Sequence, residues 1–229
     1  MTSSHLLFKR LYVWELPVRL FHVVNALCLT VLAASGFYIS GPVGPALAQE
    51  ASFQYWFGWV RFIHFAAAYA FLINLLARVY WGFVGNAYAR WREYVPTTKA
   101  CWREVKEVLK VDIFQTQLEG HIRIGHNRVA GTSYLGLFLV SLFQIATGFA
   151  LYAPMSHSWA GRAFAWVVPL MGSEAIVRQW HHAMTWVFIL FTLVHVYLVF
   201  YHDFVEGRGT ASSMVGGWKF EREDELEHH

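Results

Sequence analysis

Charged residues and cysteines are scarce in this chain of 229 residues, and each shortage excludes classes of protein. Charged residues make up 14% of the sequence and hydrophobic residues 56%, whereas soluble domains carry about 25% charged residues. That is too little charge to cover a water-exposed surface, so an ordinary soluble globule is excluded. The two cysteines, Cys28 and Cys101, are too few for a disulfide framework, a zinc ribbon or an iron–sulfur site.

The chain also lacks the features of a secreted or nucleic-acid-binding protein. Its net charge is +3 and its basic residues form no continuous stripe, so we expect no nucleic-acid partner. The first apolar run begins near Val18 with no small-residue cleavage site behind it, which argues against a cleavable signal peptide. Residues 226–229 are interpreted as a tag remnant, and residues 1–225 are expected to form one domain.

In place of charge, the chain has aromatic rings and long apolar runs. Four runs are long enough to cross about 30 Å of hydrocarbon as helices. They are residues 18–39, 59–84, 131–153 and 180–201. A fifth stretch, Ala163–Met171, is too short and contains Pro169, so we expect an interfacial segment there. The predicted fold class is an all-α membrane protein with a four-transmembrane-helix bundle.

The distribution of Lys and Arg predicts how these helices are oriented. Residues 85–130 are rich in basic side chains, and the N-terminal segment carries Lys9, Arg10 and Arg19, whereas residues 40–58 carry none. By the positive-inside rule, both termini and the 85–130 segment are expected in the cytoplasm. Residues 102–118 mix charges with Val, Leu and Ile, which predicts a short amphipathic helix at the inner membrane surface.

Four of the histidines in the predicted spans form a geometric set, and ionisable side chains there are costly and usually functional. His181 and His195 are fourteen positions apart, about 1400° of helix, and therefore project from one face about 21 Å apart. Because the second span begins at the outer surface, His64 is expected at the depth of His181. The first span begins at the inner surface, so His22 is expected at the depth of His195.

Two imidazoles at each of two levels predict two b-type haems, each held between facing helices. We expect His64 with His181 to bind the outer haem iron, and His22 with His195 to bind the inner one. His182 is about 140° out of line with His195 and is expected to be a packing residue. It would take the place of His181 as the iron ligand if the helix phase differs. Small residues would make room for the macrocycles: Ala33, Ala34, Gly36, Ala66, Ala67, Ala68 and Gly148.

Other interpretations of these histidines remain open. A single histidine at a helix end is more often an interfacial, hydrogen-bonded residue than a ligand. A histidine-lined proton or metal-ion transporter would also place imidazoles in the membrane, but such relays normally use Asp or Glu, and none lies in the predicted spans. A structural zinc site is a weaker alternative because it needs four ligands that converge at one point.

Several further polar residues are candidates for the same chemistry. Arg78 is a candidate for contacting a haem propionate, with a snorkelling side chain as the alternative. His126 and Asn127, just before the third span, are candidates for holding the carbonyls of a quinone, with a solvated loop as the alternative. Three amides are expected to bridge helices: Asn25, Asn74 and Gln144.

A series of short motifs runs through nearly the whole chain. They are Tyr12-Val-Trp-Glu-Leu-Pro-Val-Arg19, Leu20-Phe-His22, Val60-Arg-Phe-Ile-His64-Phe-Ala-Ala, Ala77-Arg-Val-Tyr-Trp81, Gly85-Asn86, Gly125-His-Asn127, Thr147-Gly-Phe-Ala-Leu-Tyr152, Trp180-His-His182, His195-Val-Tyr197 and Ser213-Met-Val-Gly-Gly-Trp218. Together they resemble the b-type cytochrome subunit of membrane-bound nickel–iron uptake hydrogenases. The tract around His64 and the segment at 180–182 are the most specific to that family.

The resemblance implies a membrane anchor with two haems in the bacterial cytoplasmic membrane. It implies that a hydrogenase, made of a small and a large subunit, docks on the outer face through its small subunit. It carries the haem ligands of the family onto His22, His64, His181 and His195. Electrons from hydrogen oxidation would pass from an iron–sulfur cluster of the partner to the outer haem, the inner haem and a quinone held near residues 125–127.

The resemblance further implies that the chain is an electron-transfer subunit and no enzyme on its own. A di-haem subunit of a formate dehydrogenase, or of another periplasmic oxidoreductase, would share this fold and remains an alternative. The sequence leaves open whether the subunit forms part of a higher oligomer.

Overall fold

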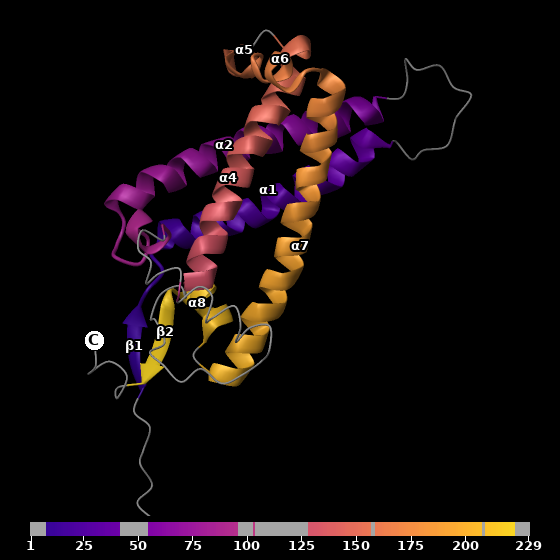
Figure 1. The fold of residues 1–229 in the computed structure, drawn as a ribbon. Coiled ribbons are helices and arrows are strands. Elements are labelled where there is room, and N and C mark those ends of the chain that lie inside the picture. Colours follow the sequence, from indigo (N-terminus) through magenta and orange to yellow (C-terminus); the bar gives the residue numbers. More distant parts are fainter. Residues whose placement is uncertain are drawn as a thin grey trace, which may run out of the picture. The chain divides into compact units, whose positions relative to one another are not determined.

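The computed structural model describes residues 8–41, 55–95, 103, 128–156, 159–207 and 209–222. Most of these residues form four long helices, which are α1 (Leu16–Ser40), α2 (Trp56–Val84), α4 (Arg128–Tyr152) and α7 (Glu174–Glu206) (Figure 1). Among the described residues, these four are long and apolar enough to cross a membrane. The four predicted spans are therefore confirmed, and each helix is longer than the apolar run that predicted it.

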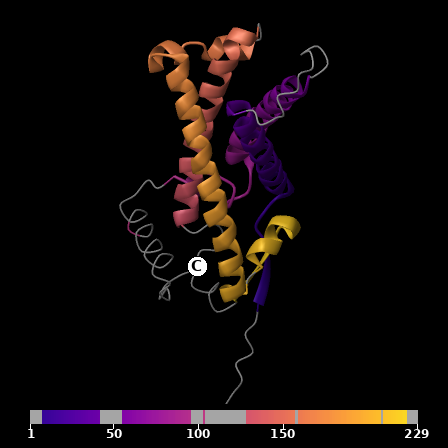
Figure 2. The ribbon, with the colours of Figure 1, turned by 90° about the vertical axis from the view of Figure 1, so that its right-hand side faces the viewer.

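Shorter elements connect the long helices. They are β1 (Phe8–Tyr12), the 3₁₀ turns η2 (Trp91–Glu93) and η3 (Ala153–Met155), α5 (Trp159–Phe164), α6 (Val167–Met171), α8 (Thr210–Gly216) and β2 (Trp218–Arg222). Helices α5 and α6, between the end of α4 and the start of α7, occupy the stretch expected at the interface (Figure 2). Neither is long enough to cross a bilayer. The amphipathic helix expected at 102–118 lies outside the described residues, apart from Arg103.

The surfaces of the long helices are largely apolar. On α7, Leu190 and Leu193 are each 65% exposed and Phe200 is 64% exposed. Large apolar side chains that point outward along a whole helix are unfavourable in water and favourable in hydrocarbon. The exposed residues therefore agree with the membrane assignment.

The chain divides into two compact units, which we describe separately. Unit 1 comprises Met1–Leu20, Val79–Phe138 and Thr192–His229, and unit 2 comprises Phe21–Arg78 and Leu139–Phe191. Unit 1 thus holds the beginnings of α1 and α4 and the ends of α2 and α7. The N-terminal and C-terminal segments consequently belong to the same unit.

An antiparallel pair of strands joins the two ends of the chain in unit 1. Strand β1 pairs with β2 (Figure 1). In this register Tyr12 is opposite Trp218. The backbone N–H groups of Val13 and Trp14 both donate to the carbonyl oxygen of Gly217, at 2.9 and 3.1 Å. Gly217 has φ 85°, a left-handed conformation that favours glycine, and it turns the chain from α8 into β2. This strand pair was not expected from the sequence.

A small buried cluster and several hydrogen bonds hold the start of α1 in unit 1. The cluster contains Val13, Trp14, Val18 and Ala89. The Trp14 indole donates to Ser213 Oγ at 3.1 Å. Glu15 Oε2 accepts from the Trp81 indole and from the Asn86 backbone N–H, both at 2.9 Å. The segment before α1 is therefore tied to the end of α2 and to α8.

Aromatic contacts join α2 to α4 in unit 2. The ring centroids of Phe65 and Tyr152 are 4.5 Å apart, and those of Tyr69 and Phe149 are 5.1 Å apart. Phe149 also stacks on Phe164 of α5 at 5.8 Å. Offset and edge-on ring pairs of this kind stabilise packing by about 0.5–1.5 kcal/mol each beyond the area that they bury. They fix the helices that carry the polar residues described next.

Candidate functional site

His64 on α2 is held by two consecutive residues of α1. Its Nδ1 lies 2.8 Å from the hydroxyl oxygen of Ser35. Ser35 is buried and His64 is half-buried. The next residue, Gly36, leaves room for the imidazole, because a Cβ placed there would lie 3.4 Å from His64 Cε1. One ring nitrogen is therefore engaged, and the ring packs against a position without a side chain.

His181 on α7 is held in the same way by α4. Its Nδ1 lies 2.9 Å from Thr147 Oγ1, and Thr147 is fully buried. A Cβ placed on the following residue, Gly148, would lie 3.0 Å from His181 Cε1. Few Cβ atoms lie that close to another atom, so a larger residue at position 148 would force the ring to shift by a few tenths of an ångström.

The two arrangements repeat one pattern within unit 2. In each, a hydroxyl residue followed by glycine on one long helix holds the imidazole of the long helix that follows it. His64 and His181 also lie within electrostatic range of each other. Since Nδ1 of each ring is engaged, Nε2 is the nitrogen that each ring has left for a metal.

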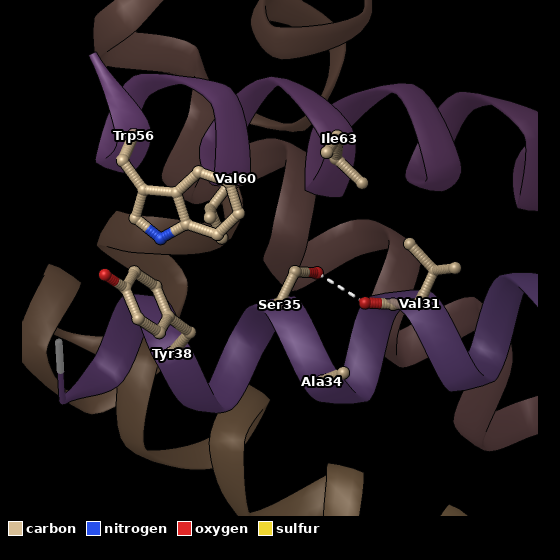
Figure 3. A pocket seen from close by; sticks show the side chains of 7 residues that line it. All are labelled: Val31, Ala34, Ser35, Tyr38, Trp56, Val60 and Ile63. Carbon is tan, nitrogen blue, oxygen red and sulfur yellow. Dashed lines mark hydrogen bonds between the residues drawn. The ribbon is translucent and has the colours of Figure 1, made fainter. Parts of the chain in front are cut away.

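An apolar cavity of about 320 Å³ lies beside Ser35, between α1 and α2 (Figure 3). Its lining residues are Val31, Ala34, Ser35, Tyr38, Trp56, Val60 and Ile63. Figure 3 shows that the Ser35 hydroxyl bonds to the carbonyl of Val31 on its own helix. The other residues that line the cavity are mostly apolar, and hydrogen bonds are electrostatically stronger where water is scarce.

The other two histidines lie in different units. His22 on α1 belongs to unit 2 and His195 on α7 to unit 1. Helix α7 is continuous from Glu174 to Glu206, so His181 and His195 share one face of it as expected, about 21 Å apart along the axis. The pairing of His22 with His195 remains a prediction.

Arg78 on α2 has the same spacing relative to His64 that His195 has relative to His181. Fourteen positions along a continuous helix place both residues of each pair on one face. Arg78 is only 4% exposed. A snorkelling guanidinium would extend into the headgroup region and remain exposed, so burial favours the alternative in which Arg78 faces the interior. His126 and Asn127 lie outside the described residues.

The smaller expectations for packing residues are confirmed. Asn74 Nδ2 donates to Asn25 Oδ1 at 2.6 Å, which joins α2 to α1. Gln144 Nε2 donates to Thr185 Oγ1 at 3.4 Å, which joins α4 to α7. His182 packs edge-on against an aromatic ring of α1, Phe37, at 5.1 Å between centroids.

Residues 13–217 match the family described as prokaryotic cytochrome b561. This chain belongs to the prokaryotic cytochrome b561 family. A relative from Azotobacter vinelandii is 42% identical over 217 residues, which are 93% of this chain and 90% of the relative. Relatives from Cupriavidus necator and Escherichia coli K12 are 41% and 35% identical, and they cover 92% and 91% of this chain and 87% and 90% of their own lengths.

These three relatives are named probable Ni/Fe-hydrogenase B-type cytochrome subunits, with the E. coli protein assigned to hydrogenase 1. The family resemblance inferred from the sequence motifs is thereby confirmed. A cytochrome b implies a b-type haem, and the residues present fit one. Two imidazoles come from two long helices, α2 and α7, with Nδ1 engaged, and glycine lies beside each ring. His64 and His181 are the residues that would hold it.

Ser35 was not singled out by the sequence, and Thr147 appeared there only as the start of a motif, without a role. The signal that would have found them is a hydroxyl residue directly before glycine in the first and third spans, one span ahead of a histidine in each case.

Proposed function

We propose that this chain is the membrane-anchoring electron-transfer subunit of a nickel–iron hydrogenase and passes electrons through two b-type haems to the quinone pool. The observation that carries the proposal is the repeated arrangement in unit 2, where hydroxyl residues hold His64 and His181 through Nδ1. A b-type haem supplies one-electron redox chemistry when it is bound between two such imidazoles. The chain itself binds, orients and shields the group.

The proposal of a second haem rests on the positions of His22 and His195 along their helices. His195 is fourteen positions beyond His181 on one face of α7, and His22 is the histidine of α1 near its cytoplasmic end. We assign His22 and His195 to the inner haem iron and His64 and His181 to the outer one. Arg78, buried on the same face of α2 as His64, is the candidate for a haem propionate, because a guanidinium pairs with carboxylates in two hydrogen bonds.

The direction of electron flow follows from the proposed topology. Both termini and the basic 85–130 segment would face the cytoplasm of a bacterium, and residues 40–58 and 154–179 would face the outside. The hydrogenase small subunit, with its large subunit, would dock on the outer face and deliver electrons to the His64–His181 level. His126 and Asn127 precede α4 on the inner side, where they are the proposed quinone contacts. Higher oligomers of the complex are compatible with this scheme.

The decisive experiment is a reduced-minus-oxidised visible spectrum with haem quantitation on the purified complex. We expect two low-spin b haems per chain, both reducible by hydrogen. His64→Ala or His181→Ala should remove one haem and disconnect the hydrogenase. His22→Ala or His195→Ala should remove the other and abolish quinone reduction, while hydrogen still reduces the outer haem.

Three outcomes would contradict this proposal in different ways. A colourless protein from iron-replete cells would favour a histidine-lined proton or metal-ion transporter. Haem with a copurified partner that lacks nickel would favour a subunit of formate dehydrogenase or of another periplasmic oxidoreductase. Haem loss in His182→Ala but not in His181→Ala would show that the ligand assignment on α7 is wrong.

A further inference from the structure

Ser35 has one hydroxyl proton and three polar neighbours, of which the carbonyl oxygen of Leu32 is the most distant at 3.4 Å. Its Oγ lies 2.5 Å from the carbonyl oxygen of Val31, one turn earlier on α1, and 2.8 Å from Nδ1 of His64 (Figure 3 shows the first contact). Two oxygens approach this closely only with a proton between them, and the carbonyl has none to give. The hydroxyl therefore donates to Val31. Its contact with His64 must then be one in which the ring donates Nδ1–H and Oγ accepts.

The same count applies to Thr147. Its Oγ1 lies 2.8 Å from the carbonyl oxygen of Phe143, one turn earlier on α4, and 2.9 Å from Nδ1 of His181. The single hydroxyl proton is directed to Phe143, so the His181 ring again donates Nδ1–H. Both rings consequently carry their proton on Nδ1 and a lone pair on Nε2.

We propose that Ser35 and Thr147 are positioning residues that fix the metal-binding tautomer of His64 and His181 and raise the basicity of their Nε2 atoms. The inference rests on the proposed function, in which these two Nε2 atoms bind the iron of one haem. A ligating histidine usually donates its other N–H to a carboxylate, a backbone carbonyl or a water, and that bond sets both ring orientation and ligand strength. Here two side-chain hydroxyls take this role.

The membrane explains why a hydroxyl is suited to the role. A carboxylate in hydrocarbon is costly, which favours a neutral acceptor there. A serine or threonine satisfies its own proton on the carbonyl four residues earlier and offers its oxygen as an acceptor, at no cost in charge. The glycine that follows each hydroxyl lets the ring come close enough to use that acceptor.

Substitutions that remove or keep the hydroxyl test this proposal in the assembled complex. Ser35→Ala and Thr147→Val remove the acceptor, whereas Ser35→Thr and Thr147→Ser retain it. Thr30→Val is the matched control, because Thr30 makes the same bond to the carbonyl four residues earlier, Ala26, at 2.8 Å. The readouts are the haem content, the midpoint potential of each haem and the electron paramagnetic resonance spectrum of the ferric protein.

We expect the haem that is lost in His64→Ala to be the one affected. A less basic imidazole stabilises ferric iron less, so Ser35→Ala and Thr147→Val should shift its midpoint potential upward, and the double variant should shift it further. Haem affinity should fall by about 10–100-fold, the usual effect of removing such a partner. Ser35→Thr, Thr147→Ser and Thr30→Val should keep the wild-type potential and spectrum.

Wild-type potential and spectrum in Ser35→Ala and Thr147→Val, with normal haem content, would overturn the proposal. An equal change in Thr147→Val and Thr147→Ser would also overturn it, because packing alone would then be responsible. If the acceptor-removing variants lose the haem altogether, retention of the haem in Thr147→Ser and Ser35→Thr supports the proposal and its loss there overturns it. If the His64→Ala variant keeps every haem, the ligand assignment is overturned first, and this inference with it.

Discussion

At the scale of single residues, Gly148 and Gly36 each leave room for an imidazole ring, but they differ in how much space a side chain would have there. A Cβ on Gly148 would lie 3.0 Å from His181 Cε1, whereas a Cβ on Gly36 would lie 3.4 Å from His64 Cε1. The first distance forces the ring to move, and the second is close to ordinary van der Waals contact. The two positions should therefore respond differently to the same small substitution.

We predict that Gly148→Ala lowers haem content and thermal stability markedly, while Gly36→Ala has a smaller effect. Overpacking costs about 1–3 kcal/mol, more than the approximately 1 kcal/mol that alanine gains over glycine in a helix. Haem per polypeptide and the unfolding temperature in detergent measure both effects. Gly136→Ala on the same helix is the control, since nothing lies within 4 Å of its Cβ position. Equal behaviour of Gly148→Ala and Gly136→Ala would contradict the argument.

The histidines of this site could be predicted from sequence, but their partners could not. His64 and His181 are ionisable groups in apolar runs, and helical periodicity alone places His181 and His195 on one face. Ser35 and Thr147 are common in membrane helices, and their importance depends on which helix lies beside them. That information is tertiary, and no spacing within one helix contains it.

At the scale of elements, the four spans were predictable because hydropathy acts locally, whereas the helix ends depend on polar residues. Helix α7 begins at Glu174, before the apolar run that starts at Trp180. Ser173 explains the extension, because its hydroxyl accepts from the Ile176 backbone N–H at 3.3 Å. Glu174 adds a negative charge in the first turn, which the helix dipole favours. A hydropathy window leaves polar residues such as Ser173 and Glu174 out of the span that it predicts.

The strand pair could not have been predicted in this way. Strands β1 and β2 are five residues each and lie near opposite ends of the chain. Neither contains a hairpin turn or a long alternating pattern, which are the local signals for strands. Their pairing depends on α1 and α7 bringing the two ends of the chain into unit 1.

Gly217→Ala should destabilise this connection between α8 and β2. Its φ of 85° disfavours alanine, and a Cβ would lie 2.6 Å from Tyr12 Cε2 and 2.7 Å from the Trp14 carbonyl oxygen. A strained residue of this kind costs about 1–3 kcal/mol, and the unfolding temperature should fall by about 2–4 °C per kcal/mol. Thermal unfolding of the purified protein measures the effect.

The neighbouring Gly216→Ala provides the comparison. Gly216 is the last residue of α8, and no atom lies within 4 Å of its Cβ position. It should unfold at or slightly above the wild-type temperature. If Gly216→Ala and Gly217→Ala lower stability equally, the strain at Gly217 is not the cause.

At the scale of the whole molecule, the distribution of charge and the strand pair agree on the relation between the two termini. The basic residues predict that both ends are cytoplasmic. The pairing of β1 with β2 requires both ends to be on one side of the membrane, whichever side that is. Neither observation depends on the other. The single domain over residues 1–225 stays a prediction, and each of the four long helices contributes to both units.

Reporter fusions test this topology directly. Green fluorescent protein fused after residue 222 should be fluorescent, and alkaline phosphatase fused there should be inactive, because the first folds in the cytoplasm and the second in the periplasm. Fusions between α5 and α6, near Ala165, should show the opposite pattern. Active phosphatase after residue 222 would invert the assignment of outer and inner haems while leaving the strand pair intact.

The strand pair also has a consequence for the order of biogenesis. Strand β1 emerges early in translation, and its partner emerges only after α7 and α8 have been made. The backbone groups of Phe8–Tyr12 that β2 pairs must therefore stay hydrated while all four spans are inserted. A chain whose synthesis stops before Gly217 lacks the strand with which β1 pairs. Such an unfinished chain would expose that open edge to proteases and chaperones at the membrane surface.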